Sequence, residues 1–446
     1  MHYVSDMNDF GQDMLALFQR CITSGVMQYL QKANGVKVRR GVYSAQVVLW
    51  LMISQRLPGW GTLAAAVQFL LAGGASGLLD DCLRVREKRI SSRTGAYSRA
   101  RLRLPTILCR QVTNELAARL RQILNPEQTR AVYLLDGSSV ELEASPRLLK
   151  TYPAAQNQHG SSHFPVVRMV VLHDLETGLA EEPRWGPMYG AAAVSEQALS
   201  EKVMDAVPKG SILLGDRNFG VFSVALAAKQ RGHDVIVRLK DDRARKVAGS
   251  PIGEPGERAV VWKPSAAECR KHGFARDTML AGRLIAARVG RGKTKQWLYL
   301  FTTVTDLDRE KIVEIYGRRW NIETDLRSLK RTVRLHHVAA QSEAMMEKDL
   351  LTAIAAYNLV RAVMALAARR HRLEPRQLSF TFVLNVVQAS LHRLVSTPPG
   401  EQYDRELDSM LDRAAQGNLP RRPKPRSFPR AVWHHRHDFP ARKVEK

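Results

Sequence analysis

Between residues 131 and 240, short apolar runs alternate with segments of helix length, and this alternation constrains the fold more than any other feature of the sequence. The first two runs carry β-branched and aromatic residues and read as a strand pair. The expected elements are strands at 131–143 and 164–174, a helix at 195–208, a strand at 211–215, a helix at 222–232 and a strand at 233–240. Strands that alternate with helices after an initial strand pair predict an α/β layer.

The charge balance points to a polyanionic partner. The chain of 446 residues carries 68 Lys+Arg against 43 Asp+Glu, a formal net charge of +25. Such an excess favours nucleic acid ahead of an anionic membrane, with a merely soluble basic enzyme as the alternative. Residues 84–103 hold eight basic residues and one acid within a region of helical pattern. This run suits contact with a DNA backbone, or else forms a solvated linker face.

Two further features bear on compartment. The four cysteines are scattered without a CxxC pair, which argues against a zinc site or a disulfide scaffold and fits a reducing cytoplasm. No signal-peptide pattern is visible at the N-terminus. Residues 350–368 are apolar over about the length of a membrane span but include Asn358 and Arg361. Because a charged residue within a span is costly, we expect a buried helix and no membrane partner.

Three carboxylates stand where elements of the α/β layer end. Asp136 and Asp216 each follow an apolar strand, and Glu323 falls on a later helix. Acids at strand ends converge at one edge of a sheet. Carboxylate oxygens with open water positions favour Mg²⁺ or Mn²⁺, and two such ions about 4 Å apart can catalyse phosphodiester chemistry. Each acid also has a plainer interpretation: turn residue, helix cap, or half of a helical ion pair.

The helix expected around Glu323 places four functional side chains on one side. At about 100° per residue, Tyr316, Arg319, Glu323 and Lys330 share an arc of about 60°. An apolar stripe lies beside them, made of Ile315, Ile322, Leu326, Leu329 and Val333. In a phosphoryl-transfer site Arg319 can orient Glu323 and contact phosphate, Lys330 can meet the backbone as a point charge, and Tyr316 can stack on a base. The alternative is a row of structural ion pairs.

The pattern Y-x-x-R-x-x-x-E-x-x-x-x-x-x-K formed by these four residues resembles the hallmark of bacterial DDE transposases of the insertion-sequence-four family. The blocks LLDGSSVEL, NQHGSSHFPVVRMVVLHDLETG and LLGDRNFG, which contain the two aspartates, resemble conserved blocks of that family, as do GAYSRARLRLP and the basic Pro-rich tail. One departure is Asn218, where the family more often has Gly; Asn also tolerates a left-handed turn.

The resemblance implies an RNase H-like catalytic core, a mixed sheet flanked by helices, with a β-strand insertion and an α-helical N-terminal DNA-binding domain. Asp136, Asp216 and Glu323 would be the catalytic acids and the ligands of two Mg²⁺ or Mn²⁺ ions. Tyr316, Arg319, Lys330 and Arg217 would bind the substrate. The expected division is a helical domain at 1–128, the core at 129–240 and 298–400, the insertion at 241–297 and a basic tail at 401–446.

The activity so implied is binding of terminal inverted repeats, cleavage of one strand, and transfer of the freed 3′-hydroxyl, first into a hairpin end and then into target DNA. A synaptic homodimer on double-stranded DNA is implied as well. Two rival hypotheses are a metal-dependent nuclease without strand transfer, and a DNA-binding regulator descended from a transposase. Trp262 and Trp297 are interpreted as core of the insertion, with stacking on a flipped base as the alternative. His159 and His163 are candidates for a loop or phosphate contact.

Overall fold

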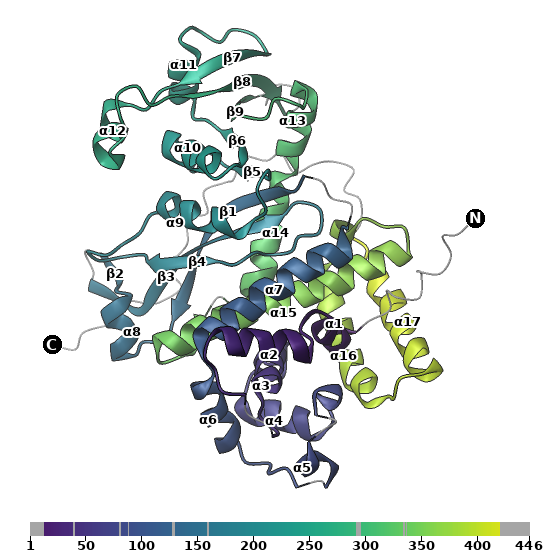
Figure 1. Cartoon of the computed structure of the whole chain (residues 1–446). Coiled ribbons are helices and arrows are strands. Elements are labelled where there is room, and N and C mark those ends of the chain that lie inside the picture. The colour runs from purple at the N-terminus through teal and green to yellow at the C-terminus, as the bar shows by residue number, and fades with distance from the viewer. Residues whose placement is uncertain are drawn as a thin grey trace, which may run out of the picture.

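The fold of the chain, seen in a computed structural model, is built on one extended sheet (Figure 1). The structure describes residues 13–38, 41–79, 82–87, 89–126, 130–157, 160–290, 296–332, 335 and 337–419. In that part of the chain ten strands join in the order β2-β3-β1-β5-β6-β9-β8-β7, with β4 on β3 and β10 on β1. Their bounds are β1 Val132–Leu142, β2 Ala154–Asn157, β3 Gly160–Asp174, β4 Arg184–Pro187, β5 Ile212–Gly215, β6 Asp234–Arg238, β7 Gly256–Trp262, β8 Leu280–Val289, β9 Gln296–Thr302 and β10 His337–Val338.

The sheet is mixed. β1 runs antiparallel to β3 and parallel to β5, and β5 runs parallel to β6. β9 then pairs antiparallel with β6, and β8 and β7 continue the antiparallel part. The predicted mixed sheet flanked by helices is confirmed. The strands expected as an insertion extend this same sheet, and two helices lie among them, α11 (Asp241–Ala248) and α12 (Ala266–His272).

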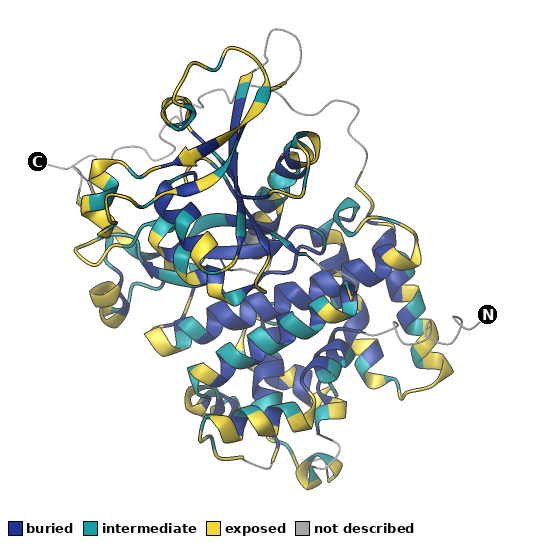
Figure 2. Ribbon diagram, turned by 45° about the horizontal axis from the view of Figure 1, so that its top comes forward, coloured by how far each residue is buried: buried dark blue, intermediate teal, exposed yellow. Residues whose placement is uncertain are grey.

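Each face of the sheet packs against its own hydrophobic cluster, because successive residues of a strand point to opposite sides. On β1, Tyr133 and Leu135 belong to the cluster that includes α9 (Glu196–Val203) and α10 (Phe222–Gln230). Leu134, between them, faces the larger cluster on the other side. The sheet is therefore buried on both faces along its centre, as Figure 2 shows for the strands that cross the molecule.

The larger cluster joins the two ends of the chain around a pair of long helices, α7 (Thr106–Leu124) and α15 (Glu343–Arg370), which lie side by side (Figure 1). Further helices of this cluster are α1 Met14–Cys21, α2 Ser24–Ala33, α3 Ala45–Ser54, α4 Leu63–Leu71, α5 Leu83–Arg86, α6 Gly95–Arg103, α8 Pro146–Thr151, α13 Arg309–Gly317, α14 Asn321–Arg327, α16 Phe380–Ser396 and α17 Glu401–Ala415. Among described residues α15 is the one helix long and apolar enough to span a membrane. Its apolar stretch is wholly buried, so the prediction of a buried helix at 350–368 is confirmed.

Residues 401–415 differ from the predicted tail. They form α17, whose Leu407, Met410, Leu411 and Ala414 are buried at the spacing of one helical face. Acids and arginines lie between these apolar residues, so the composition of the segment does not reveal its helical spacing. Residues 420–446, where the basic part of the expected tail lies, fall outside the described residues.

The helix expected around Glu323 is divided into four segments. It consists of α13 (Arg309–Gly317), a 3₁₀ turn (Arg318–Trp320), α14 (Asn321–Arg327) and a π-helical turn (Ser328–Thr332). The Ser328 hydroxyl donates to the carbonyl of Thr324 over 2.9 Å, and the Thr324 hydroxyl donates to that of Asn321 over 2.7 Å. Such bonds to the preceding turn bend helices. The even arc expected for Tyr316 to Lys330 is therefore broken at both ends of α14.

Gly220 provides a test of how the loop after β5 is seated. A Cβ at Gly220 would lie 2.0 Å from the carbonyl oxygen of Arg238, whereas one at Gly253 would meet nothing within 4 Å. Gly220→Ala is therefore expected to lower the free energy of unfolding by about 1–3 kcal/mol. Gly253→Ala, the control, should change it by less than about 0.5 kcal/mol. Chemical denaturation measures both, and equal values for the two variants would contradict the close approach.

Candidate active site

The site begins with two aspartates brought together by parallel strand pairing. In the β1–β5 register Leu135 lies opposite Gly215, so the next residues, Asp136 and Asp216, emerge side by side at one edge of the sheet. Both are half-buried. A carboxylate oxygen of Asp136 accepts the backbone N–H of Gly137 at 2.8 Å, and one of Asp216 accepts the N–H of Asn218 at 2.7 Å. The expected convergence of the two aspartates is present, but only Asp216 follows the end of its strand, because β1 continues past Asp136 to Leu142.

Negative charge accumulates at this edge. The pKa of Asp136 is raised to about 6, chiefly by burial and also by the nearby charges of Asp216 and Glu196, against the opposing effects of the Gly137 hydrogen bond and the Arg319 charge. A carboxyl group with such a pKa is held close to other anions in a poorly solvated place. Perturbed acids of this kind are concentrated at functional sites.

Arg319 lies between the aspartate pair and Glu323. Its charge acts on Asp136, and one of its guanidinium nitrogens is 4.0 Å from a carboxylate oxygen of Glu323. The Glu323 side chain is 34% exposed, and that of Arg319 is 17% exposed. Among described residues no group of three or more His, Cys, Asp or Glu side chains is close enough to hold a metal ion. The structure thus pairs Asp136 with Asp216, and Arg319 interacts with both Asp136 and Glu323.

The other predicted substrate-binding residues differ in exposure. Tyr316 is 7% exposed, and its burial raises the pKa of the phenol, with Arg319, Arg238 and Asp216 as charged neighbours. Lys330 falls in the π-helical turn and is half-buried, while Arg217 is exposed directly after Asp216. Tyr316 and Arg319 therefore line the acidic site from α13 and the 3₁₀ turn, and Arg217 flanks it.

Sequence reasoning missed Glu196 as a member of the site. It opens α9 after the N-cap Ser195, and its carboxylate lies so close over Gly137 that a Cβ there would be 2.4 Å from it. The side-chain amide of Asn218 donates to Glu196 over 2.5 Å, and Gln197 donates to both oxygens of Asn218. A fourth carboxylate therefore faces the aspartates, and Asn218, which departs from the family pattern, holds it there.

The aromatic and histidine candidates lie apart from the acids or outside the description. Trp262 is 4% exposed and contacts Phe222 and Phe301 edge to face, so its predicted place in the core is confirmed. Trp297 is half-buried and stacks on Tyr299, with the Arg288 guanidinium 4.0 Å from the ring centroid. His163 is exposed, and His159 lies outside the described residues.

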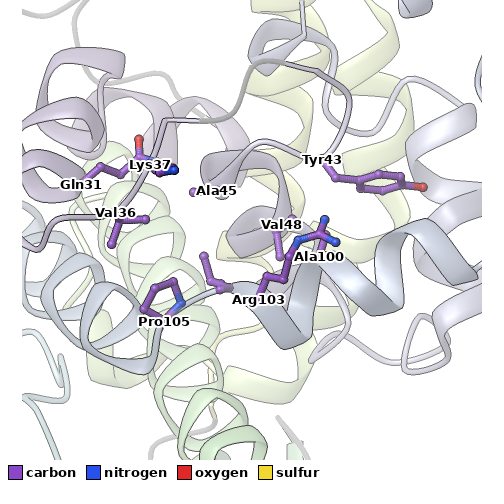
Figure 3. A pocket seen from close by; sticks show the side chains of 10 residues that line it. Gln31, Val36, Lys37, Tyr43, Ala45, Val48, Ala100, Arg103 and Pro105 are labelled. Atoms are coloured by element: carbon purple, nitrogen blue, oxygen red, sulfur yellow. The ribbon is translucent and has the colours of Figure 1, made fainter.

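A hollow among the N-terminal helices is unrelated to the acids (Figure 3). It has a volume of about 60 Å³, and Gln31, Val36, Tyr43, Arg103 and Pro105 are among its lining residues. That space holds a few water molecules at most. It is too small for the ligand that this strongly basic chain predicts.

Comparison with known proteins agrees with the predicted resemblance. A family model described as "Transposase DDE domain" matches residues 127–359, a segment that contains all three acids. The transposase InsG for insertion sequence element IS4 of Escherichia coli (strain K12) is 26% identical over 309 residues, which are 67% of this chain and 66% of the relative. This match spans just under two thirds of that relative. The resemblance to the insertion-sequence-four family is confirmed.

Among solved structures, the cryo-EM structure of the piggyBac transposase synaptic complex with hairpin DNA matches with a TM-score of 0.40 and 12% identity. The match covers 92% of this chain and 86% of the solved one.

The raised pKa of Asp136 has a testable consequence for stability. The unfolded chain ionises this group at an ordinary pKa, so in metal-free protein stability is highest below that value and falls as pH rises through about 6. Asp136→Asn removes the buried charge and should raise the free energy of unfolding by about 1–3 kcal/mol at pH 7.5. Thermal unfolding with a chelator measures the difference. An advantage that fails to shrink as the pH is lowered toward 4 would contradict the assignment.

Proposed function

We propose that this chain, which belongs to the transposase DDE domain family, is a DNA transposase that binds terminal inverted repeats, cuts them and joins the freed ends to target DNA. The observation that carries the proposal is the Asp136–Asp216 pair, with a raised pKa at Asp136 and with Arg319 acting on both Asp136 and Glu323. Acids crowded in this way are suited to a cationic cofactor and an anionic substrate.

The chemistry of the donors suits a divalent metal. Asp136 and Asp216 offer hard oxygen ligands, and Glu323, which is partly exposed on α14, would complete the set. When bound, Mg²⁺ or Mn²⁺, with two ions in our proposal, supplies activation of a water or 3′-hydroxyl and neutralises the leaving oxygen. The guanidinium of Arg319 partly neutralises these acids in the present arrangement and would turn to the substrate phosphate instead.

The chain's own residues then bind and orient DNA. In our proposal Arg319, Lys330 and Arg217 contact phosphates around the cleaved bond, and Tyr316 supports Arg319 from its buried position. No side chain is needed as a covalent nucleophile, because the attacking groups are water and a DNA hydroxyl. We further propose that the end is released through a hairpin and that two copies of the chain act together on two ends.

Two basic surfaces support a DNA partner. The first lies on α5, α6 and the residues between them, where Arg84, Arg86, Arg89, Arg93, Arg99 and Arg103 are all exposed. The second is a groove of about 510 Å³ formed by α11, β7 and the start of α12, lined by Lys240, Arg243, Lys246 and Lys263 beside two acids. In our proposal residues 1–128 bind DNA and residues 129–240 and 298–400 catalyse. The segment 241–297 is an insertion and 401–446 the C-terminal segment.

Removing the acids should separate catalysis from binding. Asp136→Ala, Asp216→Ala and Glu323→Ala are each expected to lower the rate of DNA cleavage in Mg²⁺ by at least about 1,000-fold. Affinity for inverted-repeat DNA should stay within a few-fold of the unchanged protein. Single-turnover cleavage and a DNA-shift assay measure the two quantities.

Glu314→Gln is the matched control, since Glu314 is an exposed acid on α13 that pairs with Lys311. It should cleave at the unchanged rate. Wild-type protein that cleaves without joining would support a nuclease instead, and function that survives loss of all three acids would support a DNA-binding regulator.

A further inference from the structure

We propose that Asp325 is a positioning residue: its buried ion cluster with Arg361 and Arg376 fixes the orientation of α14, and with it the side on which Glu323 meets the Asp136–Asp216 pair. This inference rests on the proposed function, because it gives Glu323 a partner set to be aimed at. It concerns residues on the opposite side of the helix from the acidic site.

α14 needs such an anchor because of what flanks it. The helix has only 7 residues, with a 3₁₀ turn before it and a π-helical turn after it. A continuous α-helix would fix the direction of Glu323 through its neighbouring turns, but the change of helix type on each side removes that constraint. Glu323 and Asp325 are two residues apart, so their side chains point about 200° apart around the axis. Fixing one therefore fixes the other.

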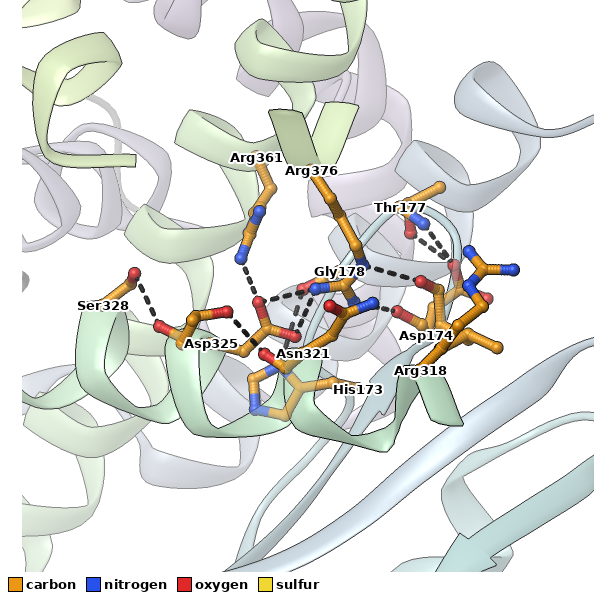
Figure 4. Close-up of polar contacts among 12 residues, drawn as sticks. His173, Asp174, Thr177, Gly178, Arg318, Asn321, Asp325, Ser328, Arg361 and Arg376 are labelled. Carbon is orange, nitrogen blue, oxygen red and sulfur yellow. Dashed lines mark hydrogen bonds and ion pairs between the residues drawn. The ribbon is translucent and has the colours of Figure 1, made fainter. Parts of the chain in front are cut away.

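The anchor is an ion cluster with every member buried or nearly so (Figure 4). Asp325 is fully buried and pairs with Arg361 of α15, whose side chain is 4% exposed. The Nη1 of Arg376, which lies in the 3₁₀ turn Pro375–Gln377, is 2.9 Å from both carboxylate oxygens of Asp325. Burial alone would raise the pKa of Asp325, but the two guanidinium groups outweigh it and hold this pKa below its usual value.

The cluster also connects to the strand that pairs with β1. Arg376 donates to the carbonyl of Leu175 at 2.7 Å and to that of Asp174 at 3.0 Å, at the end of β3. Arg361 donates to the hydroxyl of Tyr357, which donates to the carbonyl of Gly178 at 2.9 Å. Asp174 at the end of β3, and Thr177 and Gly178 of the turn that follows it, lie to one side of the cluster in Figure 4.

β3 in turn pairs directly with β1, with Tyr133 opposite Asp174 and Asp136 opposite Val171. A second contact joins the same turn to the approach to α14: Arg318 forms two hydrogen bonds with Glu176, of 2.7 and 2.8 Å. The path from Glu323 to Asp136 thus runs through α14, the ion cluster, the β3 turn and the β1–β3 ladder. Each step is a hydrogen bond or ion pair with fixed geometry.

A buried ion pair is weak evidence for stability alone, since apolar residues of similar volume can stabilise a core equally well. What charge-assisted hydrogen bonds from two arginines add is a fixed direction for the carboxylate that they hold. The Asp325 cluster sits where direction matters, behind a catalytic candidate on a short helix. If Asp325 positions Glu323, replacing Asp325 should lower metal affinity and cleavage as well as stability. If its role is merely structural, only stability should fall.

The test compares Asp325→Asn with Asp349→Asn in the full chain. Asp349 lies on α15, is also an acid paired with two arginines, Arg56 and Arg101, and has a side-chain exposure of 9%. Both variants should unfold at lower temperature. Assayed well below both midpoints, Asp325→Asn should lower single-turnover cleavage about 100-fold and Mn²⁺ affinity about 10-fold. Hydrogen exchange of the α14 amides should also become faster.

Asp349→Asn should leave cleavage, Mn²⁺ affinity and α14 exchange within about 3-fold of the unchanged protein. The proposal is overturned if Asp325→Asn matches wild type in Mn²⁺ affinity and α14 exchange, or if Asp349→Asn loses as much in both. Mn²⁺ binding, by electron paramagnetic resonance, and hydrogen exchange need no DNA. A wild-type protein that fails to cleave would therefore refute the proposed function while leaving this comparison decisive.

Discussion

The parallel pairing of β1 with β5 places two carboxylates side by side, and the rest of the site is arranged around that negative charge. Backbone N–H groups of Gly137 and Asn218 solvate one oxygen of each aspartate, and Arg319 supplies a positive charge across from them. Yet Glu196 adds a further anion, and the pKa of Asp136 remains raised. The fold thus holds in place a cluster of acids whose repulsion only a cation or a proton relieves, at a cost to its own stability.

The parts of this arrangement that depend on local pattern could be predicted from the sequence. In the sequence, a short apolar run stops at each of Asp136 and Asp216, and parallel pairing of the two runs brings the acids together without knowledge of any other contact. The buried stripe beside Glu323 follows from helical spacing, and Ile315, Ile322, Leu326 and Leu329 are all buried. The pairing of Asp136 with Asp216 and the position of Glu323 beside an apolar stripe could therefore be predicted from the strand period of 2 residues and the helix period of 3.6 residues.

Features that depend on distant partners could not be predicted in this way. Glu196 looks like an ordinary first-turn acid, which is favourable at any helix N-terminus, and only the β1 register brings Gly137 beneath it. The pairing of β9 with β6, which merges the expected insertion with the main sheet, joins segments with no common local signal. The helix around Glu323 is divided where the hydroxyl groups of Ser328 and Thr324 hydrogen-bond to the preceding turn and where Arg318 pairs with Glu176. None of these contacts changes the periodicity of the sequence.

Two polar residues of α15 stand out in the sequence, but their role depends on contacts with distant parts of the chain. In the sequence Asn358 and Arg361 served to exclude a membrane span, because both interrupt an apolar stretch. In the fold Asn358 exchanges two hydrogen bonds of 2.8 Å with the backbone of Ala180, and Arg361 receives Asp325. The buried helix α15 therefore contacts the turn after β3 through Asn358 and α14 through Arg361, two residues that are three positions apart. Since β3 sets the position of Asp136 and α14 that of Glu323, one helix of the core determines how acids far apart in sequence are placed relative to each other.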